Sequence, residues 1–375
     1  MSATSLGEAL PDRFEQEFPD RFEDGIQFTK YTSFGNTFLI VNEAKNPLPD
    51  DEHRAAFARW ALNRDFGIGG ADNVLYLRRA DSTERSADGR RADFVFRIFE
   101  VDGSETLSCG NGLLSTAAYL HEVTGAERWR MLTEVPSGSP KLTEVGVTGT
   151  PGGTWVNVGW PRPVAETLYR RAGSVPQDAI DEVPPLAVPL PRHEPWAAGL
   201  PAEVVLSGLL TFTGEPHMVL FEELGFPAEL SGTLWADPGP EARIGQPDTQ
   251  EMADSRALVH FLGGYVNRTY RSMFPLGVHL NFARLRDTGT IEYRTWERAI
   301  DCETLACGSG TVAMTHVGRS RGVVDGTELT FWPHRCRWYQ PAAALTVWQT
   351  DGGFLVGGAP RLVCTGVAPK SSWQE

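Results

Sequence analysis

The chain has 375 residues, of which 41% are hydrophobic, so it is long enough for two domains and too apolar for a disordered chain. Its formal net charge of −14 argues against nucleic acid and anionic membranes as partners, because an acidic protein neutralises neither. Its five cysteines are too few, and odd in number, for a disulfide framework.

The N-terminal region carries no targeting signal that we can recognise. No stretch approaches the roughly 18 apolar residues of a membrane span, and no basic segment precedes an apolar run. We therefore expect a cytoplasmic protein with reduced cysteines. Residues 1–25 are rich in acidic side chains, which favours a solvated acidic extension over a docking arm.

The first half of the chain predicts mostly strands. Residues 26–43 predict a strand–turn–strand with Gly35 and Asn36 at the turn. The glycine-rich loop at 66–72 is not a phosphate-binding loop, because it lacks a Lys-Ser/Thr pair and leads into a strand. The other predicted elements here are helices at 53–66 and 110–124, the latter stopped by Gly125, and strands at 73–77, 92–101, 131–136, 141–148 and 154–160.

The second half contains two proline-rich stretches, 183–202 and 226–248, which predict surface loops or insertions. Around them we predict a short helix at 309–318 and strands at 204–213, 217–221, 278–285, 289–296, 328–332, 343–348 and 353–357. Strands outnumber helices and are interleaved with them. The predicted fold class is therefore α+β, in two halves.

An internal repeat links the two halves. Residues 105–112 (ETLSCGNG) and 303–310 (ETLACGSG) agree at six of eight positions. Upstream, 97–100 and 294–297 share the pattern Arg-x-aromatic-Glu, and each repeat then enters a helix. This predicts a duplicated unit whose copies are related by a pseudo-twofold axis.

The repeat places Cys109 and Cys307 just before a helix, each in a Cys-Gly-x-Gly turn. A helix N-terminus lowers the pKa of a thiol, and its free N–H groups can hold a carboxylate. A pseudo-twofold axis would put the two sulfurs on opposite faces of a bound molecule. One thiolate could then remove a proton from a carbon while the opposite thiol returns one, which inverts a stereocentre.

The remaining cysteines lack this context, and we interpret Cys302, Cys336 and Cys364 as structural or incidental. No metal is expected, because neither Cys-x-x-Cys nor a paired-histidine spacing occurs. A disulfide between Cys109 and Cys307 on oxidation stays open, and so does a redox role for the pair. No Gly-x-Ser-x-Gly motif supports acyl transfer.

At these residues the chain resembles the diaminopimelate epimerase family, from about Phe28 to Ala368. The resemblance rests on the segments at 30–38, 66–69, 102–112, 297–310 and 363–368. It implies two pseudo-symmetric halves, each a β-barrel-like sheet wrapped around a central helix. We expect an extension at 1–25 and halves at 26–162 and 163–375, with room for the last strand to return to the first half.

The resemblance also implies roles for individual residues. Cys109 and Cys307 would be the acid/base pair, without a cofactor, and His217 and Glu297 would help to deprotonate the second thiol. The expected partners are a small amino-acid substrate and, at most, a second copy of the chain. The full set of implied substrate-binding residues is Asn36, Glu100, Gly110, Asn111, Glu215, His217, His279, Glu297, Arg298, Gly308 and Ser309.

Three positions depart from the family pattern, which has asparagines facing the far end of the substrate. Here they are Glu100, Glu215 and His279, whereas Glu297 and Arg298 are kept. At about 4 Å and an effective dielectric constant of about 20, each like-charge contact costs roughly 4 kcal/mol. A distal carboxylate would be repelled and a distal cation favoured.

We therefore predict an isomerase that inverts the α-carbon of an amino acid with a basic side chain. One alternative is that a glutamate is protonated or paired with Arg298 and the substrate is diaminopimelate. A second alternative is a non-catalytic amino-acid-binding homologue, although retention of both Cys-Gly-x-Gly turns argues against it.

Overall fold

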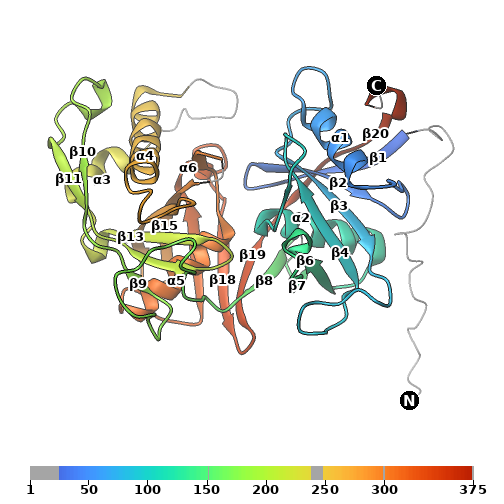
Figure 1. The fold of residues 1–375 in the computed structure, drawn as a ribbon. Coiled ribbons are helices and arrows are strands. Elements are labelled where there is room, and N and C mark those ends of the chain that lie inside the picture. The colour runs from blue at the N-terminus through green and yellow to red at the C-terminus, as the bar shows by residue number, and fades with distance from the viewer. Residues whose placement is uncertain (1–24, 151, 238–247, 299, 374–375) are drawn as a thin grey trace, which may run out of the picture. The chain divides into compact units, whose positions relative to one another are not determined.

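The computed structural model describes residues 25–150, 152–237, 248–298 and 300–373. The chain divides into two compact units, one formed by Met1–Asn157 with Gly357–Glu375 and the other by Val158–Val356 (Figure 1). Both combine strands with a few helices, which confirms the predicted α+β class. The extension predicted at 1–25 lies almost wholly outside the described residues. None of the described helices has the length and apolar character that a membrane span requires.

The first unit contains most of the N-terminal elements and the last strand of the chain. Two strands, β8 (Thr154–Gly159) and β19 (Gly353–Gly358), cross the boundary between the units. The other elements of the first unit are β1 (Gly25–Ser33), β2 (Asn36–Asn42), α1 (Asp51–Leu62), β3 (Asn73–Arg79), β4 (Phe94–Phe99), β5 (Glu105–Thr106), α2 (Gly110–Thr124), β6 (Arg128–Thr133), η1 (Val135–Ser137), β7 (Lys141–Val147), β20 (Arg361–Pro369) and η4 (Lys370–Ser372).

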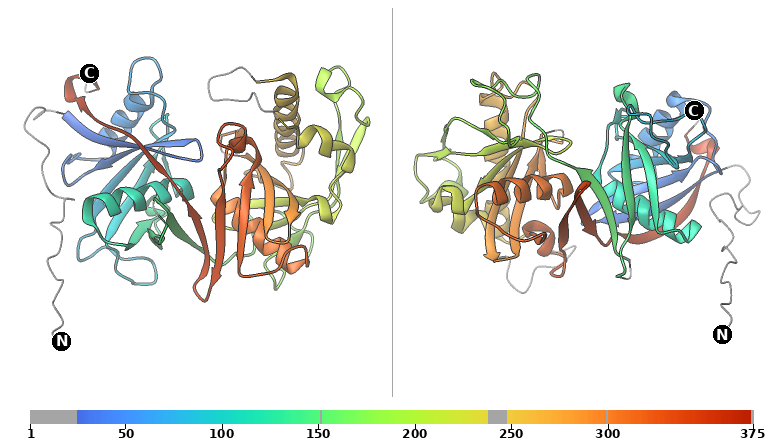
Figure 2. Two further views of the ribbon diagram at one scale, coloured as in Figure 1. Left: turned by 180° about the vertical axis from the view of Figure 1, so that it is seen from behind. Right: turned by 90° about the horizontal axis from the view of Figure 1, so that it is seen from below.

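The sheet of the first unit wraps around α2. Strand β1 pairs with β2 on one side and β20 on the other, and the sheet continues through β3, β4, β6 and β7. Because α2 contacts β1 and β2 as well as β7, strands from distant parts of this sheet pack on one helix (Figure 2). Most residues in the first three turns of the helix are buried, as expected of a central helix. It ends at Gly125, whose φ of 70° lies in the left-handed region.

The second unit has the same central arrangement and additional elements. Its elements are β9 (Asp181–Glu182), β10 (Leu186–Pro189), η2 (Pro195–Ala197), β11 (Glu203–Leu206), β12 (Leu209–Phe212), β13 (Pro216–Phe221), η3 (Glu222–Leu224), α3 (Ala228–Leu234), α4 (Gln250–Thr269), β14 (His279–Asp287), β15 (Thr290–Glu297), β16 (Cys302–Thr304), α5 (Gly308–Ser320), β17 (Glu328–Pro333), α6 (His334–Arg337) and β18 (Leu345–Thr350). Helix α5 contacts β12, β13, β14 and β18, so it takes the central place that α2 has in the first unit.

The proline-rich stretch at 183–202 is not the surface loop that its composition predicts. Strand β10 pairs with β11 as a separate two-stranded sheet. Leu186 and Val188 are fully buried, and they alternate with exposed neighbours along β10. This alternation was present in the sequence, but the prolines outweighed it in the prediction. Pro189 is tolerated because it ends a strand of a two-stranded sheet.

Helix α4, which has 20 residues, was not predicted from the sequence. Its N-cap is Thr249, whose side chain accepts a hydrogen bond from the Met252 N–H at 3.3 Å. Gly263 faces the core, where an added Cβ would lie 2.2 Å from the ring of Trp296. Glycine therefore lets α4 approach β15 closely, directly beside Glu297.

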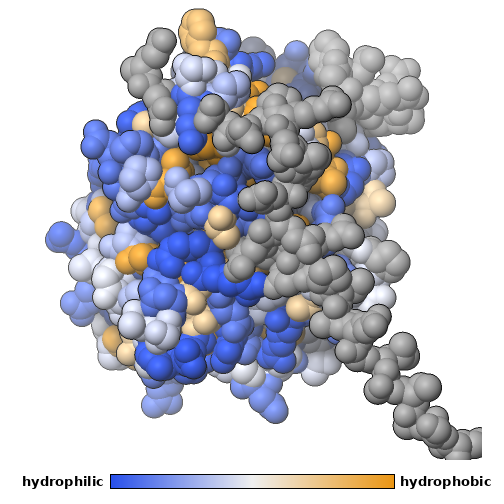
Figure 3. All heavy atoms as spheres, turned by 90° about the vertical axis from the view of Figure 1, so that its right-hand side faces the viewer, coloured by the Kyte–Doolittle hydropathy of each residue, from blue (hydrophilic) through white to orange (hydrophobic). Residues whose placement is uncertain are grey.

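The described surface of the first unit fits a water-exposed protein. In Figure 3 its visible face is mostly hydrophilic, with hydrophobic residues scattered among the polar ones.

The turn between β1 and β2 lies at Phe34 and Gly35, one residue earlier than predicted, because Ser33 pairs with Asn36. Both turn residues have positive φ, 53° and 87°, as tight hairpins of this kind require.

Candidate active site

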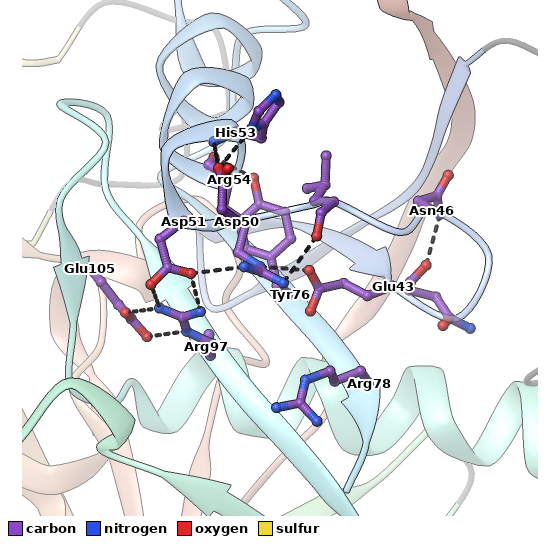
Figure 4. A network of polar contacts seen from close by, with 12 residues as sticks. Glu43, Asn46, Asp50, Asp51, His53, Arg54, Tyr76, Arg78, Arg97 and Glu105 are labelled. Atoms are coloured by element: carbon purple, nitrogen blue, oxygen red, sulfur yellow. Dashed lines mark hydrogen bonds and ion pairs between the residues drawn. The ribbon is translucent and has the colours of Figure 1, made fainter. Parts of the chain in front are cut away.

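The turn that carries Cys109 is anchored by an ion pair between Arg97 of β4 and Glu105 of β5. Arg97 Nε donates to Glu105 Oε1 at 2.7 Å, and Nη2 contacts Oε2. Arg97 also donates to Asp51 at the start of α1, at 2.9 Å, and the network continues to Arg54 (Figure 4). The side chains of Arg97 and Glu105 are 13% and 12% exposed, so water screens this pair little.

The turn that carries Cys307 has the same anchor. Arg294 Nε and Nη2 donate to the two carboxylate oxygens of Glu303 at 2.6 and 2.7 Å. This pair is more deeply buried, with side-chain exposures of 0% and 4%. In each unit, the Arg-x-aromatic-Glu and Glu-Thr-Leu segments of the repeat are thus neighbouring strands joined by an arginine–glutamate ion pair. We call this pair of strands the clamp, and the chain passes from each clamp directly into a Cys-Gly-x-Gly turn.

Both cysteines are N-cap residues. Cys109 has φ −143° and ψ 121°, Cys307 has φ −128° and ψ 110°, and the following glycine begins the helix in each case. An N-cap residue with extended backbone leaves the N–H groups of the first helical turn without intrahelical partners. Each sulfur therefore belongs to a turn whose backbone N–H groups can receive an anion.

In the first unit, two of the predicted binding residues contact each other. Asn111 Nδ2 donates to Asn36 Oδ1 at 2.9 Å, which ties the start of α2 to the start of β2. Glu100, at the end of β4, accepts a hydrogen bond from Asn73 Nδ2 at 2.7 Å. Asn73 was not among the predicted residues. Its position directly after the predicted glycine-rich loop was the available signal.

In the second unit, Cys307 is surrounded by polar groups but shielded from water. Its Sγ lies 3.4 Å from Ser309 Oγ, and Glu297 accepts a hydrogen bond from Thr304 Oγ1 at 2.7 Å. Burial raises the pKa of the Cys307 thiol well above its usual range, the charge of Glu297 raises it further, and the hydrogen bond with Ser309 acts in the opposite direction. The expected lowering by the helix N-terminus is therefore outweighed at Cys307.

The predicted distal residues of the second unit form a second cluster. Arg298 donates to one oxygen of Glu215, Oε2, from Nε at 3.0 Å and from Nη2 at 2.5 Å. Its Nη1 donates to the carbonyl of Leu276 at 2.6 Å. Burial acts to raise the pKa of Glu215, but contact with His279 and the charge of Arg298 outweigh it, so the pKa falls to about 2. Glu215 and Arg298 are thus a charged pair at neutral pH.

Two histidines lie beside this pair. The rings of His217 and His279 stack, with centroids 4.8 Å apart and planes 21° from parallel. His279 Nε2 lies 3.7 Å from Glu215 Oε2, too long for a hydrogen bond. Neither ring nitrogen of His279 has a hydrogen-bond partner among the described residues, although both are buried.

His217 is fully buried and connects the distal cluster to the cysteine turn. Its Nε2 lies 3.0 Å from Ser309 Oγ, and its Nδ1 lies 3.0 Å from the side-chain nitrogen of Asn281. Sequence reasoning did not select Asn281. It could have done so, because alternation along β14 puts Asn281 on the same face as His279.

The predicted site residues therefore fall into two sets, one in each unit. The first set is Asn36, Glu100, Cys109, Gly110 and Asn111, and the second is Glu215, His217, His279, Glu297, Arg298, Cys307, Gly308 and Ser309. The other three cysteines form no disulfide with a described residue; Cys302 and Cys364 are exposed and Cys336 is buried. The roles of the site residues stay predictions.

Comparison with known proteins identifies the family. A family model described as diaminopimelate epimerase matches residues 28–161. A diaminopimelate epimerase of Methanothrix thermoacetophila is 31% identical over 306 residues, which cover 80% of this chain and 84% of that one. The chain belongs to the diaminopimelate epimerase family. It is accordingly an isomerase.

Further members of the diaminopimelate epimerase family align over most of the chain. A diaminopimelate epimerase of Bacillus velezensis is 27% identical over 346 residues, which cover 92% of this chain and 99% of that one. Among solved structures, a hydroxyproline epimerase from Agrobacterium vitis with bound trans-4-hydroxy-L-proline has a TM-score of 0.54 at 15% identity, covering 93% and 94% of the two chains. A probable proline racemase from Agrobacterium radiobacter has a TM-score of 0.52 at 15% identity, covering 91% and 92%. These two structures confirm the fold.

Proposed function

We propose that this protein is a cofactor-independent amino-acid racemase or epimerase in which Cys109 and Cys307 act as the acid/base pair. The observation that carries the proposal is the duplicated turn. Each cysteine is the N-cap of a central helix and follows a clamp made by an arginine and a glutamate. A reaction that needs one proton-transfer group on each face of a carbon accounts for two such turns.

In the proposed reaction, one thiolate takes the α-proton and becomes a thiol, while the opposite thiol gives its proton to the other face of the carbon and becomes a thiolate. Charge and protons balance, and the enzyme ends in the complementary protonation state. The backbone N–H groups at Gly110, Asn111, Gly308 and Ser309 would hold the α-carboxylate and stabilise the negative charge that develops on it.

The surroundings of Cys307 support an assignment of the resting state. Burial and the charge of Glu297 raise the pKa of the Cys307 thiol, so this group rests as the proton donor. In a reaction that starts from this state, Cys109 would act as the base. For a substrate of the opposite configuration, the enzyme works from the complementary state, with a thiolate at Cys307.

The pairing of Glu215 with Arg298 supports a substrate without a distal carboxylate. Such a pair is compatible with diaminopimelate as substrate, but its geometry favours a substrate that ends in a cation. Three of the five N–H donors in the guanidinium of Arg298 already donate to protein acceptors, Glu215 and the carbonyl of Leu276. A substrate carboxylate would share Arg298 with Glu215 and would be repelled by the negative charge of Glu215. Because both contacts fall on Oε2, the other oxygen of Glu215 is not used by Arg298, and a distal cation could bind there.

Diaminopimelate remains the second candidate substrate, because the curated relatives at 25–31% identity bear that name. A substrate panel separates the two candidates. We expect faster racemisation of arginine, lysine, ornithine or histidine than of diaminopimelate. Chiral chromatography measures the rate for each amino acid. Faster turnover of diaminopimelate would contradict the basic-side-chain proposal and leave the two-cysteine proposal intact.

The acid/base pair is tested by Cys109→Ala and Cys307→Ala. Each substitution should abolish inversion, because inversion needs one proton-transfer group on each face of the α-carbon, whereas the remaining thiol can at most exchange the α-proton with solvent deuterium on its own face. Proton NMR in D₂O and chiral chromatography measure the two events separately. The matched control is Cys302→Ala, which removes an exposed thiol directly before Glu303 and should leave both rates unchanged. Full inversion by either alanine variant at position 109 or 307 would refute the pair.

A further inference from the structure

The side chain of Asn281 has one orientation that satisfies its neighbours. Its nitrogen, Nδ2, lies 3.4 Å from the carbonyl of Met218, and a carbonyl can only accept a hydrogen bond. Its oxygen, Oδ1, accepts from Thr295 Oγ1 at 3.1 Å. Oδ1 also lies where a side chain at Gly310 would begin, since an added Cβ there would be 2.5 Å away. Glycine at this point of the Cys-Gly-Ser-Gly turn makes room for the amide.

This orientation determines which ring nitrogen of His217 carries the proton. Nδ2 of Asn281 is a donor, so Nδ1 of His217, 3.0 Å away, must be the acceptor. His217 is fully buried. Burial is the main cause that lowers its pKa well below the usual range, and the neighbouring His279 lowers it further, so the ring is neutral. A neutral imidazole with a free Nδ1 has its proton on Nε2.

The proton on Nε2 gives the remaining contacts a direction. Nε2–H donates to Ser309 Oγ at 3.0 Å, and the hydroxyl of Ser309 is then free to donate to the sulfur of Cys307 at 3.4 Å. A further hydrogen bond, from Thr213 Oγ1 to the Ser309 carbonyl at 2.9 Å, holds this residue in place. The chain Asn281–His217–Ser309–Cys307 therefore runs from donor to acceptor and ends at sulfur.

We propose that Asn281 is a positioning residue that holds His217 in the Nε2-protonated form, so that His217 and Ser309 stabilise Cys307 when it is a thiolate. His217 then acts as a hydrogen-bond donor, and not as the base that the family resemblance implied. The effect on turnover rests on the proposed function, because each catalytic cycle passes through a state with a thiolate at Cys307. The protonated form of His217 does not depend on the proposed function.

The protonation of His217 can be observed directly in the full-length protein without substrate. In ¹⁵N NMR spectra of protein labelled at its eight histidines, the signals of His217 are those that disappear in His217→Gln. We expect protonated Nε2 and unprotonated Nδ1 in the wild type, and loss of this single form in Asn281→Leu. Protonated Nδ1 in the wild type, or an unchanged spectrum of His217 in Asn281→Leu, would overturn the proposal.

Kinetics then separates positioning from binding. In Asn281→Leu, His217 is no longer held in the Nε2-protonated form, so the hydrogen-bond support for the Cys307 thiolate is lost. We therefore expect kcat to fall by roughly tenfold, with KM within about twofold of the wild type. A rise in KM at unchanged kcat would contradict the proposal. If Asn281→Leu does not fold, His217→Gln and His217→Leu decide. Glutamine keeps an N–H donor but cannot take up a proton, so it should retain more activity than leucine; equal loss would overturn the donor role.

These outcomes remain separate from the test of the cysteine pair. If Cys109→Ala or Cys307→Ala were active, the two-base reaction would fail while the NMR result on His217 stood. If His217 proved to be protonated at Nδ1, the role of Asn281 would fail, and the alanine variants at the cysteines would still be inactive.

Discussion

Glu215 is the residue that distinguishes this chain most clearly from its family pattern. The family resemblance places an asparagine there, and the exchange adds a negative charge beside Arg298. The structure shows that this charge is used within the protein, since Glu215 and Arg298 form an ion pair with side chains 38% and 20% exposed. A partly exposed pair of this kind remains accessible to a ligand. It supports a site that recognises a cation through Glu215.

Replacement of Glu215 by glutamine should reverse part of this preference. The variant releases Arg298 from a carboxylate, so we expect kcat/KM for diaminopimelate to rise and that for the basic amino acids to fall, with a change in their ratio of about tenfold or more. Glu229→Gln, an exposed position on α3, removes the same charge and is the matched control. An unchanged ratio would show that Glu215 does not take part in substrate selection.

Glu297 provides a prediction about the thiol of Cys307. Burial and the negative charge of Glu297 raise its pKa, and a raised thiol pKa means less thiolate at a given pH. Glu297→Gln removes the second cause, so Cys307 should ionise at lower pH and react faster with iodoacetamide. Peptide mapping by mass spectrometry over a range of pH values measures this, and the exposed Cys364 in the same samples is the internal reference. If the labelling rate of Cys307, divided by that of Cys364, were lower in Glu297→Gln than in the wild type, the assignment would be contradicted.

At the scale of elements, the hairpin of β10 and β11 shows why composition misled the prediction. Prolines are common in loops because they lack an N–H donor, but a strand at the edge of a small sheet does not need every donor. Leu186 pairs with Leu206 across the hairpin, and both are fully buried. Trp196, in the segment of chain that connects the two strands, packs against Phe261 of α4 with ring centroids 5.5 Å apart. The stretch is thus part of the core of the second unit.

Alanine substitutions at two adjacent positions of β11 test whether the hairpin belongs to the core. Leu206→Ala removes a fully buried side chain and should lower the free energy of unfolding by about 2–5 kcal/mol. Val205→Ala, one residue earlier on the opposite face and 48% exposed, should change it by less than about 1 kcal/mol. Urea unfolding followed by circular dichroism compares the two. Equal effects would mean that the hairpin does not contribute its inner face to the core.

At the scale of the whole molecule, the internal repeat explains how one sequence provides two related turns. Arg97 and Glu105 in the first unit correspond to Arg294 and Glu303 in the second, and the strands that carry them pair in the same register. The copies then differ at the position after Cys-Gly. Asn111 contacts Asn36 in the first unit, whereas Ser309 contacts His217 in the second.

The two-base proposal requires both sulfurs to reach the same α-carbon, although they belong to different units. Mild oxidation should therefore form a Cys109–Cys307 disulfide and abolish activity, with recovery after dithiothreitol. Non-reducing peptide mapping identifies the bond, and Cys109→Ala should not form it. Activity that appears only in the oxidised protein would instead favour the redox alternative. Oxidation confined to Cys302 and Cys364 would count against the proposed arrangement.

Much of the architecture could be predicted from the sequence. Most of the longer strands, α2, α5 and the two cysteine turns were found because alternation, glycine stops and an internal repeat are properties of residues close together in the chain. The prediction failed at α4, where a long amphipathic pattern was overlooked between two proline-rich stretches, and at β10, where prolines hid an alternation. Family membership followed from the motifs and was confirmed by the comparisons.

The sequence by itself determined the α+β class, the family and the candidate residues, because these follow from local patterns and from a repeat of eight residues. Only the tertiary structure decided how three of those candidates behave. It pairs Glu215 with Arg298, buries Cys307 near Glu297, and places His217 against Asn281, which was not a candidate. Each of these depends on strand pairing and burial between segments far apart in the chain, and charge state and proton position follow from such surroundings rather than from neighbouring residues.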